Sequence, residues 1–211
     1  MDWSASKLAT KKIIPKRQLE IKLDKLETLK TPKLGLEQYP VSAEAASELL
    51  YMAGFEHNDL DGKTIDLGTG TGRLAIGATL MGASNIVGLD VDRPSIDIAA
   101  RNARESNVNV EWVIGDLNSV VSGFQTVLMN PPYGTRSPHM DARFLTRAFE
   151  LAPVTYSIHK SSTRNFLSEL AKKNGRRVDE VRSLEMRIPH LFDFHRKKWE
   201  TIQVDLYRIT T

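Results

Sequence analysis

Asp66-Leu67-Gly68-Thr69-Gly70-Thr71-Gly72 is the stretch that decides the fold, because it joins two segments of different periodicity. The residues before it, 62–65, are typical of a short buried strand, and the apolar run over 74–78 is typical of a helix. Glycines at alternate positions allow a ligand to approach the backbone closely. A strand, a glycine turn and a helix in this order predict the first unit of an α/β sheet, with a binding site at the turn.

The spacing of the glycines separates this turn from the fingerprint of dinucleotide sites. Gly68, Gly70 and Gly72 alternate, whereas a nicotinamide site normally has its third glycine one residue later. Asp66 also argues against a pyrophosphate, because its carboxylate would repel one, whereas it would attract an ammonium group. We therefore expect Asp66, the three glycines and Thr71 to bind a cofactor that carries an amine.

Asp90 is the second candidate in this binding site. It ends the mostly apolar run 85–89, about twenty residues after the glycine turn, which is the spacing of a residue that binds ribose hydroxyls. Asp90 could instead cap the next helix. Asp92 is better placed for that role, because Pro94 would then lie in the first helical turn.

Asp116 and Leu117 follow the third expected strand, which covers 108–114. A carboxylate at the end of that strand could accept a hydrogen bond from an adenine amino group while Leu117 packs on the ring. An ordinary turn at Asp116 is the alternative.

Asn130-Pro131-Pro132-Tyr133 follows the apolar run 127–129, which is typical of a buried parallel strand. The Asn130 side-chain oxygen and the Pro131 carbonyl could accept both N–H bonds of a planar amine and help to localise its lone pair. Pro131 and Pro132 fix the backbone that aims these oxygens, and Tyr133 offers a face on which a flipped base can stack. These four residues form the expected catalytic motif. A simple proline turn after a strand is the alternative.

Taken together, these motifs at successive strand ends resemble those of class I S-adenosylmethionine-dependent methyltransferases. The Asn130 motif resembles that of the members that methylate amino groups. The resemblance implies an α/β, Rossmann-like fold with a seven-stranded, mostly parallel sheet, an antiparallel last strand and helices on both faces. It also implies S-adenosyl-L-methionine as the cofactor. Residues 41–211 are expected to form this single domain, and residues 1–40 a basic helix and a segment that covers the cofactor.

The composition fits one domain of this kind. A chain of 211 residues, of which 41% are hydrophobic, can bury a three-layer core. The 29 basic and 26 acidic residues give a net charge of +3, which matters only where charges cluster. No apolar stretch is long enough to span a bilayer and the start lacks the apolar region of a secretory signal, so the cytoplasm is the expected location. Without cysteine there are no disulfides, and no metal site is expected.

Basic residues cluster in the first 33 positions, and leucines recur at helical spacing over 16–30. We expect an amphipathic helix there. Its basic face could contact nucleic-acid phosphates, or its leucines could pack it onto the domain, and the sequence leaves both possibilities open.

Gln38 and Tyr39 lie in the loop that connects this helix to the domain. Many methyltransferases with a similar Asn-Pro-Pro motif close the methionine end of the cofactor with such a segment, which implies this role for Gln38 and Tyr39. A turn that enters the next helix is the alternative.

Two cationic groups are expected at the same rim of the sheet as Asn130. His159, Lys160 and Arg164 follow an expected strand over 154–158. The second group lies between expected strands over 178–187 and 201–209 and comprises His195, Arg196, Lys197 and Lys198. Both groups are candidates for contact with an RNA backbone. A structural histidine and an ordinary charged hairpin loop are the alternatives.

The whole chain resembles the methyltransferase-like protein 5 family. The resemblance is carried by the segment 32–40, the glycine turn, the Asn130 motif and, most specifically, the segments 159–164 and 194–198. It implies methylation of the N(6) amine of an adenosine in small-subunit ribosomal RNA, and hence RNA as the partner. Thr69 and Thr71 stand where better-known members tend to have cysteines, and Tyr133 stands where they have phenylalanine. The lack of cysteines and of long insertions suits an archaeal member.

Eukaryotic members of this family work with a small zinc-ribbon activator that adds a strand to the sheet edge, here expected along 108–114. Whether this chain requires one stays open. Three other functions remain as alternatives: N5-glutamine methylation of a protein, nicotinamide-dependent oxidoreduction, and RNA binding without catalysis. The basic termini favour a polyanion over a protein substrate, and an oxidoreductase has no use for the Asn130 motif.

Overall fold

A seven-stranded sheet organises the molecule, as seen in the computed structural model, which describes residues 14–133, 140–189 and 199–211. The order across the sheet is β3-β2-β1-β4-β5-β7-β6, and every strand is parallel to β1 except β7. The bounds are β1 (Thr64–Leu67), β2 (Ile86–Asp90), β3 (Glu111–Ile114), β4 (Thr126–Met129), β5 (Val154–Lys160), β6 (Arg177–Pro189) and β7 (Trp199–Thr210). This confirms the predicted fold class, including the antiparallel last strand.

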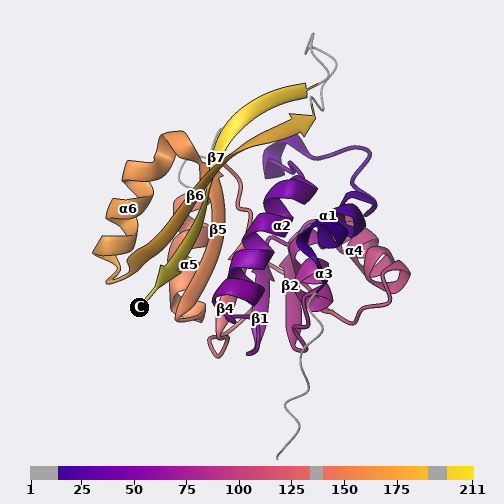
Figure 1. Ribbon diagram of the computed structural model, residues 1–211, viewed down its shortest axis with the longest axis horizontal. Coiled ribbons are helices and arrows are strands. Elements are labelled where there is room, and N and C mark those ends of the chain that lie inside the picture. Colours follow the sequence, from indigo (N-terminus) through magenta and orange to yellow (C-terminus); the bar gives the residue numbers. More distant parts are fainter. Residues whose placement is uncertain (1–13, 134–139, 190–198) are drawn as a thin grey trace, which may run out of the picture.

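Helices cover both faces of the sheet (Figure 1). One face packs against α1 (Lys16–Asp24), α2 (Ala43–Tyr51) and α3 (Arg73–Leu80), and the other against α5 (Met140–Leu151) and α6 (Arg164–Lys173). The remaining helical elements are η1 (Leu34–Leu36), η2 (Met52–Glu56), α4 (Arg93–Glu105) and η3 (Ser161–Thr163). β1 and β4 are buried along their whole length, as expected for central parallel strands. No helix in the described ranges is long and apolar enough to cross a membrane.

The first helix ends earlier than the leucine spacing predicts. α1 ends at Asp24, and the side chain of Asn102 in α4 forms hydrogen bonds with the backbone that follows it. Asn102 Oδ1 accepts from the Glu27 N–H at 2.9 Å, and its Nδ2 donates to the Glu27 carbonyl at 3.0 Å. These two bonds satisfy backbone groups that would otherwise require another helical turn. Leu26 is buried nonetheless, so the chain beyond the helix still packs on the core.

Several strand boundaries also differ from the predictions. β3 begins at Glu111 rather than at residue 108, because the Val108 N–H donates to the Ala103 carbonyl and Asn107 has a left-handed φ of 53°, so both belong to the end of α4. β5 continues to Lys160 because it pairs with β7 up to Val204. The β6–β7 hairpin is likewise longer than predicted, and its strands pair from Arg177 to Pro189.

The order β2-β1-β4 explains why the sequence motifs meet in space. The chain leaves β1 toward β2 on one side, while β4 flanks β1 on the other, so a crevice opens at the carboxyl ends of β1 and β4. The glycine turn follows β1, and the Asn130 motif follows β4. Both therefore flank the same crevice.

Leu23 tests whether α1 belongs to the core. It is fully buried and packs near Gly77 of α3, where a β-carbon would meet its side chain at 3.2 Å. We expect Leu23→Ala to lower the free energy of unfolding by about 2–5 kcal/mol, because the loss leaves a cavity. Ile21, 44% exposed on the same helix, is the matched control, and Ile21→Ala should change stability by no more than about 0.5 kcal/mol. Chemical denaturation measures both, and equal small effects would mean that α1 is only loosely docked.

Candidate active site

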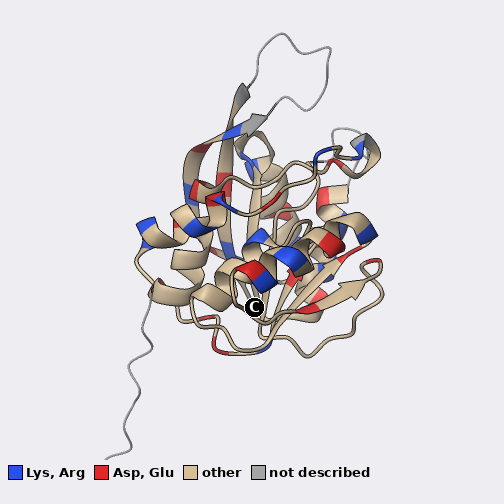
Figure 2. Ribbon diagram, turned by 90° about the vertical axis from the view of Figure 1, so that its right-hand side faces the viewer, with Lys and Arg blue, Asp and Glu red and all other residues tan. Residues whose placement is uncertain are grey.

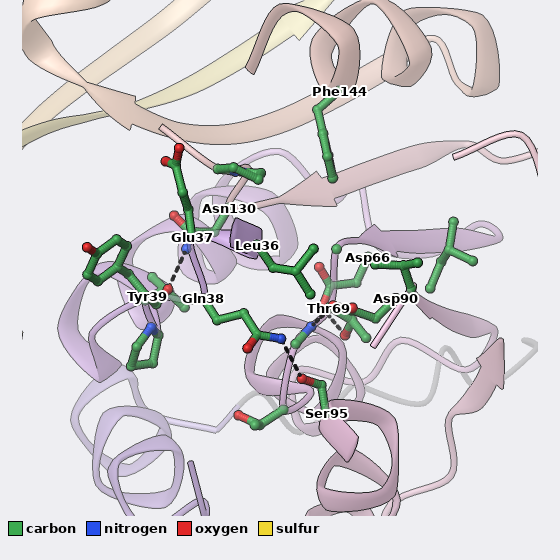
Figure 3. A pocket seen from close by; sticks show the side chains of 18 of the residues that line it. Leu36, Glu37, Gln38, Tyr39, Asp66, Thr69, Asp90, Ser95, Asn130 and Phe144 are labelled. Atoms are coloured by element: carbon green, nitrogen blue, oxygen red, sulfur yellow. Dashed lines mark hydrogen bonds between the residues drawn. The ribbon is translucent and has the colours of Figure 1, made fainter. Parts of the chain in front are cut away.

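A cavity of about 330 Å³ opens at the carboxyl edge of the sheet. Figure 3 shows side chains from several elements pointing into it. Its wall is formed by the glycine turn, the ends of β2 and β3, the Asn130 motif, the start of α5 and the segment 35–41. The structure thus brings together all but Gly72 of the residues predicted to bind the cofactor, which were chosen from four separate stretches of sequence.

Asp66 lies at the base of this cavity and is only 1% exposed. Its Oδ2 atom accepts from the Thr69 hydroxyl at 2.6 Å and from the Ala75 N–H at 3.0 Å. Its Oδ1 atom is buried and has no hydrogen-bond partner among the described residues. Burial raises the pKa of Asp66 to about 7, although the two bonds act in the opposite direction. A cationic donor at Oδ1 would stabilise the ionised form.

The glycine turn has the backbone conformation that its sequence requires. Gly68, Gly70 and Gly72 have φ values of 70°, 55° and 88°, in the left-handed region that favours glycine. A β-carbon at Gly72 would come within 2.8 Å of Trp112, so this glycine is required for packing. A β-carbon at Gly70 would meet no atom within 4 Å, although Gly70 lines the cavity. The space beside Gly70 is thus open for a ligand.

Asp90 lines the cavity at the end of β2. Its Oδ2 accepts from the Gly70 N–H at 2.8 Å and its Oδ1 from the Asp92 N–H at 2.8 Å, while burial raises its pKa. Each oxygen keeps a further lone pair that could bind a hydroxyl. Asp92, not Asp90, caps α4, since its side chain accepts from the Ser95 N–H at 3.2 Å. The predicted division of roles between the two carboxylates is therefore consistent with the geometry.

Asp116 and Leu117 also line the cavity, beyond the end of β3. The Asp116 side chain accepts from the Asn118 N–H at 2.7 Å, so the residue forms a turn in addition to facing the cavity. The Leu117 carbonyl accepts from Arg147 Nε at 3.0 Å, which ties this loop to α5. The two interpretations of Asp116, as a turn residue and as a residue that lines the site, are therefore compatible.

Gln38 and Tyr39 line the cavity from the segment that precedes α2. Gln38 Oε1 accepts from the Lys33 N–H at 2.7 Å, and its Nε2 donates to Ser95 Oγ at 3.3 Å (Figure 3). The Tyr39 N–H donates to the Glu37 carbonyl at 2.7 Å, and Glu37 has a left-handed φ of 47°. This tight turn holds both predicted residues in the cavity wall.

The Asn130 motif reaches the same space from β4. Asn130 and Pro132 line the cavity, whereas Pro131 and Tyr133 are absent from its wall. Asn130 Nδ2 donates to the Tyr39 carbonyl at 3.4 Å, and the Tyr133 hydroxyl donates to Asn130 Oδ1 at 3.5 Å. The side-chain amide is therefore oriented with its oxygen toward Tyr133 and its nitrogen toward the segment that closes the site.

The structure corrects one of the predicted RNA contacts. His159 is 1% exposed, because β5 runs two residues further than predicted and carries this side chain into the core. Its Nε2 lies 2.6 Å from Ser157 Oγ, its ring meets Tyr207 edge-on at 5.8 Å, and burial lowers its pKa to about 3. His159 is thus a buried structural histidine, and it does not present a charge to a phosphate.

The other predicted contacts differ in their surroundings. Arg164 is paired with Asp205 at 2.7 Å, and half-buried Lys160 has its Nζ 5.3 Å from the centre of the Tyr133 ring. His195, Arg196, Lys197 and Lys198 lie outside the described residues. At the amino-terminal end, Lys16 pairs with Glu48, Arg17 with Glu20 and Lys33 with Asp92. Figure 2 accordingly shows acidic and basic residues interspersed on that side of the molecule.

Several residues that line the cavity were not predicted from the sequence. Phe144 of α5 points into it (Figure 3) and lies so close to Gly68 that a β-carbon there would be 2.9 Å from its ring. Leu36 and Ser95 also contribute, as does Thr69, whose hydroxyl bonds Asp66. The only signal for Thr69 and Leu36 was their place inside quoted segments, and no local pattern distinguishes Phe144 from an ordinary core residue.

The cavity fits a cofactor with an ammonium group and a ribose. Asp66 supplies a buried oxygen that lacks a donor, Gly70 leaves space beside the backbone, and Asp90 supplies acceptors at the end of the neighbouring strand. An acceptor for an ammonium group and acceptors for ribose hydroxyls are the groups that S-adenosylmethionine requires.

Comparisons with known proteins agree with this assignment. The methyltransferase small domain model matches residues 42–154. The rRNA N(6)-adenosine-methyltransferase Mettl5 of Drosophila melanogaster is 37% identical to the chain over 201 residues, which cover 91% of this chain and 94% of the relative. The chain belongs to the METTL5 family of methyltransferases. It is therefore a methyltransferase, and S-adenosylmethionine is its methyl donor.

Two archaeal proteins are also similar over the whole chain. Protein MJ0284 of Methanocaldococcus jannaschii is 36% identical over 93% of this chain and 94% of its own length. The crystal structure of PH1948 from Pyrococcus horikoshii, proposed to be an RNA methyltransferase, superposes with a TM-score of 0.87 at 39% identity and covers 94% of this chain and 98% of that one. The similarity to these two proteins therefore covers nearly the whole chain and is not confined to the methyltransferase small domain.

Gly70 allows the cofactor site to be tested separately from the fold. Gly70→Ala should weaken binding of S-adenosylhomocysteine at least tenfold, because the added methyl group occupies the open space, while the positive φ lowers stability by about 1–2 kcal/mol. Gly175→Ala is the control, since Gly175 has a φ of 68° with open space around it but lies at the end of α6. Titration calorimetry and thermal denaturation report the two effects. Equal affinities for the two variants would exclude a cofactor at Gly70.

The raised pKa of Asp66 predicts a pH dependence of cofactor binding. Only the ionised carboxylate attracts the cofactor's ammonium, so affinity should rise as the pH increases through about 7, and fall as Asp66 is protonated below that value. The dissociation constant of S-adenosylhomocysteine should increase severalfold as the pH falls from about 7.5 to about 6, a change that can only increase the protonation of its amine. Asp66→Asn should bind weakly and with a flatter profile. A profile that is the same in both proteins would contradict the assigned role.

Proposed function

We propose that this protein transfers a methyl group to the exocyclic N(6) amine of an adenosine in small-subunit ribosomal RNA. The observation that carries the proposal is the position of Asn130 at the wall of the cofactor cavity, with its side-chain amide held by Tyr39 and Tyr133. The substrate class is supported by whole-length similarity to proteins named rRNA N(6)-adenosine-methyltransferases.

Asn130 and Pro131 act on the substrate amine. An amine on an aromatic base is a poor nucleophile because its lone pair is delocalised into the ring. The Asn130 Oδ1 atom and the Pro131 carbonyl accept its two N–H bonds and help to localise the lone pair on nitrogen. S-adenosylmethionine supplies a methyl group on a positively charged sulfur, which becomes a neutral thioether when the nitrogen takes the methyl. The nitrogen then loses a proton to solvent, so the site needs no general base.

Tyr133 binds the base itself. An adenosine inside a helix cannot reach the cavity, so it has to leave the stack, and an aromatic ring next to the two acceptors gives the flipped base a new stacking partner. Phenylalanine would serve the stacking role equally well, because the ring and not the hydroxyl provides the surface.

The proposal also assigns roles to the other parts of the chain. Residues 1–40 comprise a basic helix and a segment that covers the cofactor, with Gln38 and Tyr39 at its methionine end, and residues 41–211 form the methyltransferase domain. The segment 195–198 contacts the RNA backbone, with its cluster of cationic side chains. The protein acts in the cytoplasm, where its RNA substrate is present.

A small zinc-ribbon activator pairs with β3 in this proposal. β3 is at the edge of the sheet, and its end carries Ile114, which is 48% exposed. An edge strand offers unpaired backbone groups to a partner strand, and an exposed isoleucine adds apolar contact.

Asn130→Ala provides the test. Labelled methyl transfer from S-adenosylmethionine to small-subunit ribosomal RNA, followed by nucleoside analysis, should give N(6)-methyladenosine with the wild-type protein. The variant should lose at least about a hundredfold in rate, because it lacks one of the two acceptors. Its affinity for S-adenosylhomocysteine should stay within about threefold, because Asn130 holds the amine and not the cofactor. Loss of both functions together would indicate a cofactor role or a damaged fold.

Other outcomes point to other substrates. Methyl transfer that survives ribonuclease and appears on a protein glutamine would replace the RNA proposal, because the same two acceptors suit an amide nitrogen. RNA binding with no transfer, even when a zinc-ribbon protein is supplied, would favour a noncatalytic role.

A further inference from the structure

Lys160 contacts the aromatic ring of the Asn130 motif. Its Nζ lies 5.3 Å from the centre of the Tyr133 ring, within the range of an attractive cation–π interaction. None of the ion pairs formed among the described residues includes Lys160. Within the described structure, therefore, no ion pair competes with the contact between this ammonium and the Tyr133 ring.

The backbone holds Lys160 firmly in this place. It is the last residue of β5 and pairs with Val204 of β7, so its Cα is fixed by the sheet. Directly after it, the Thr163 hydroxyl donates to the Lys160 carbonyl at 2.8 Å and closes the turn of η3. The lysine side chain therefore starts from a rigid base rather than from a loop.

A buried carboxylate fixes the turn that follows Lys160. Asp205 of β7 is 0% exposed and accepts from Ser161 Oγ at 2.7 Å and from Arg164 Nε at 2.7 Å. Ser183 Oγ donates to it at 2.9 Å. Burial opposes ionisation of Asp205, but the bonds from Arg164, Ser161 and Ser183 outweigh it and lower its pKa to about 2. The turn is thus held by a carboxylate that stays ionised.

Tyr133 is confined by the same arrangement. Its ring packs on the edge of the hydrophobic cluster that contains Ile158, its hydroxyl meets Asn130, and Lys160 lies over its face. Residues 131 and 132 are prolines, so the backbone leading to Tyr133 has little freedom. Lys160 adds a cation over the face of this ring.

We propose that Lys160 is a positioning residue that fixes the Tyr133 ring for stacking of the target base, rather than a ligand of an RNA phosphate. This inference rests on the proposed function, because it assigns Tyr133 to the flipped adenine. Tyr133 touches the base, and Lys160 acts through Tyr133. A neutral side chain of similar length at position 160 would leave the ring without its cation and free to turn.

Salt dependence separates the two possible roles of Lys160. Each phosphate contact makes the logarithm of RNA affinity fall more steeply with the logarithm of salt concentration, by about one unit of slope. A positioning residue changes the rate of methyl transfer and leaves that slope unaltered. The measurements are therefore kcat, KM and RNA affinity at several salt concentrations for the wild type, Lys160→Met and Lys160→Arg.

We expect Lys160→Met to lower kcat about tenfold at every salt concentration, with the slope of RNA binding unchanged. Lys160→Arg should restore most of the rate, because a guanidinium also binds an aromatic face. Lys172→Met is the matched control, since Lys172 is exposed in the last turn of α6, and it should behave as the wild type. A Lys160→Met variant with unchanged kcat and a shallower slope would overturn the proposal in favour of a phosphate contact.

A spectrum of the free protein tests the contact without RNA. Protons above an aromatic ring resonate at higher field, so the ε-methylene protons of Lys160 should be shifted in the wild type and return to the ordinary lysine position in Tyr133→Leu. The absence of that shift would overturn the inference whatever the substrate. A wild-type protein that shows the shift but methylates no RNA would instead refute the proposed function, so the two failures are distinguishable.

Discussion

The carboxylate of Asp66 is the constraint on which the site depends. One of its oxygens joins the end of β1 to the first turn of α3 through Thr69 and Ala75, so the glycine turn between them is held in a single conformation. That conformation presents the Gly70 N–H to Asp90 on the next strand, which links the two walls of the cavity. The other oxygen of Asp66 is buried and has no donor among the described residues, which is unfavourable in the free protein. A cationic ligand would supply the missing donor.

Residues at strand ends were predictable from the sequence because strand and turn are both local signals. An apolar run followed by glycines, a carboxylate or an Asn-Pro-Pro sequence identifies the carboxyl end of a parallel strand, and all such ends share one edge of the sheet. Asp66, Asp90, Asp116 and Asn130 were therefore found without knowledge of the fold, and the structure gathers them at one cavity.

Features set by contacts between distant segments could not be predicted in this way. α1 ends at Asp24 because Asn102, more than seventy positions away, bonds the backbone of Glu27. His159 is buried because β7 pairs two residues further along β5 than local sequence indicates. Phe144 reaches the cavity only because α5 crosses the glycine turn. In each case the partner that decides the outcome lies far away in the sequence. Local periodicity and spacing therefore do not reveal the contact.

Two buried carboxylates, Asp66 and Asp205, differ in the partners that surround them. Asp205 is surrounded by hydrogen-bond donors, and one of them is the guanidinium of Arg164. Its pKa is therefore lowered, and its charge is neutralised within the fold. Among the described residues Asp66 has two neutral donors and no cationic partner, so burial dominates and raises its pKa to about 7. A carboxylate left in that condition weakens the free protein unless a ligand supplies the missing charge. The difference in partners, rather than burial alone, therefore distinguishes the residue that we propose to bind the cofactor from the one that holds the turn after Lys160.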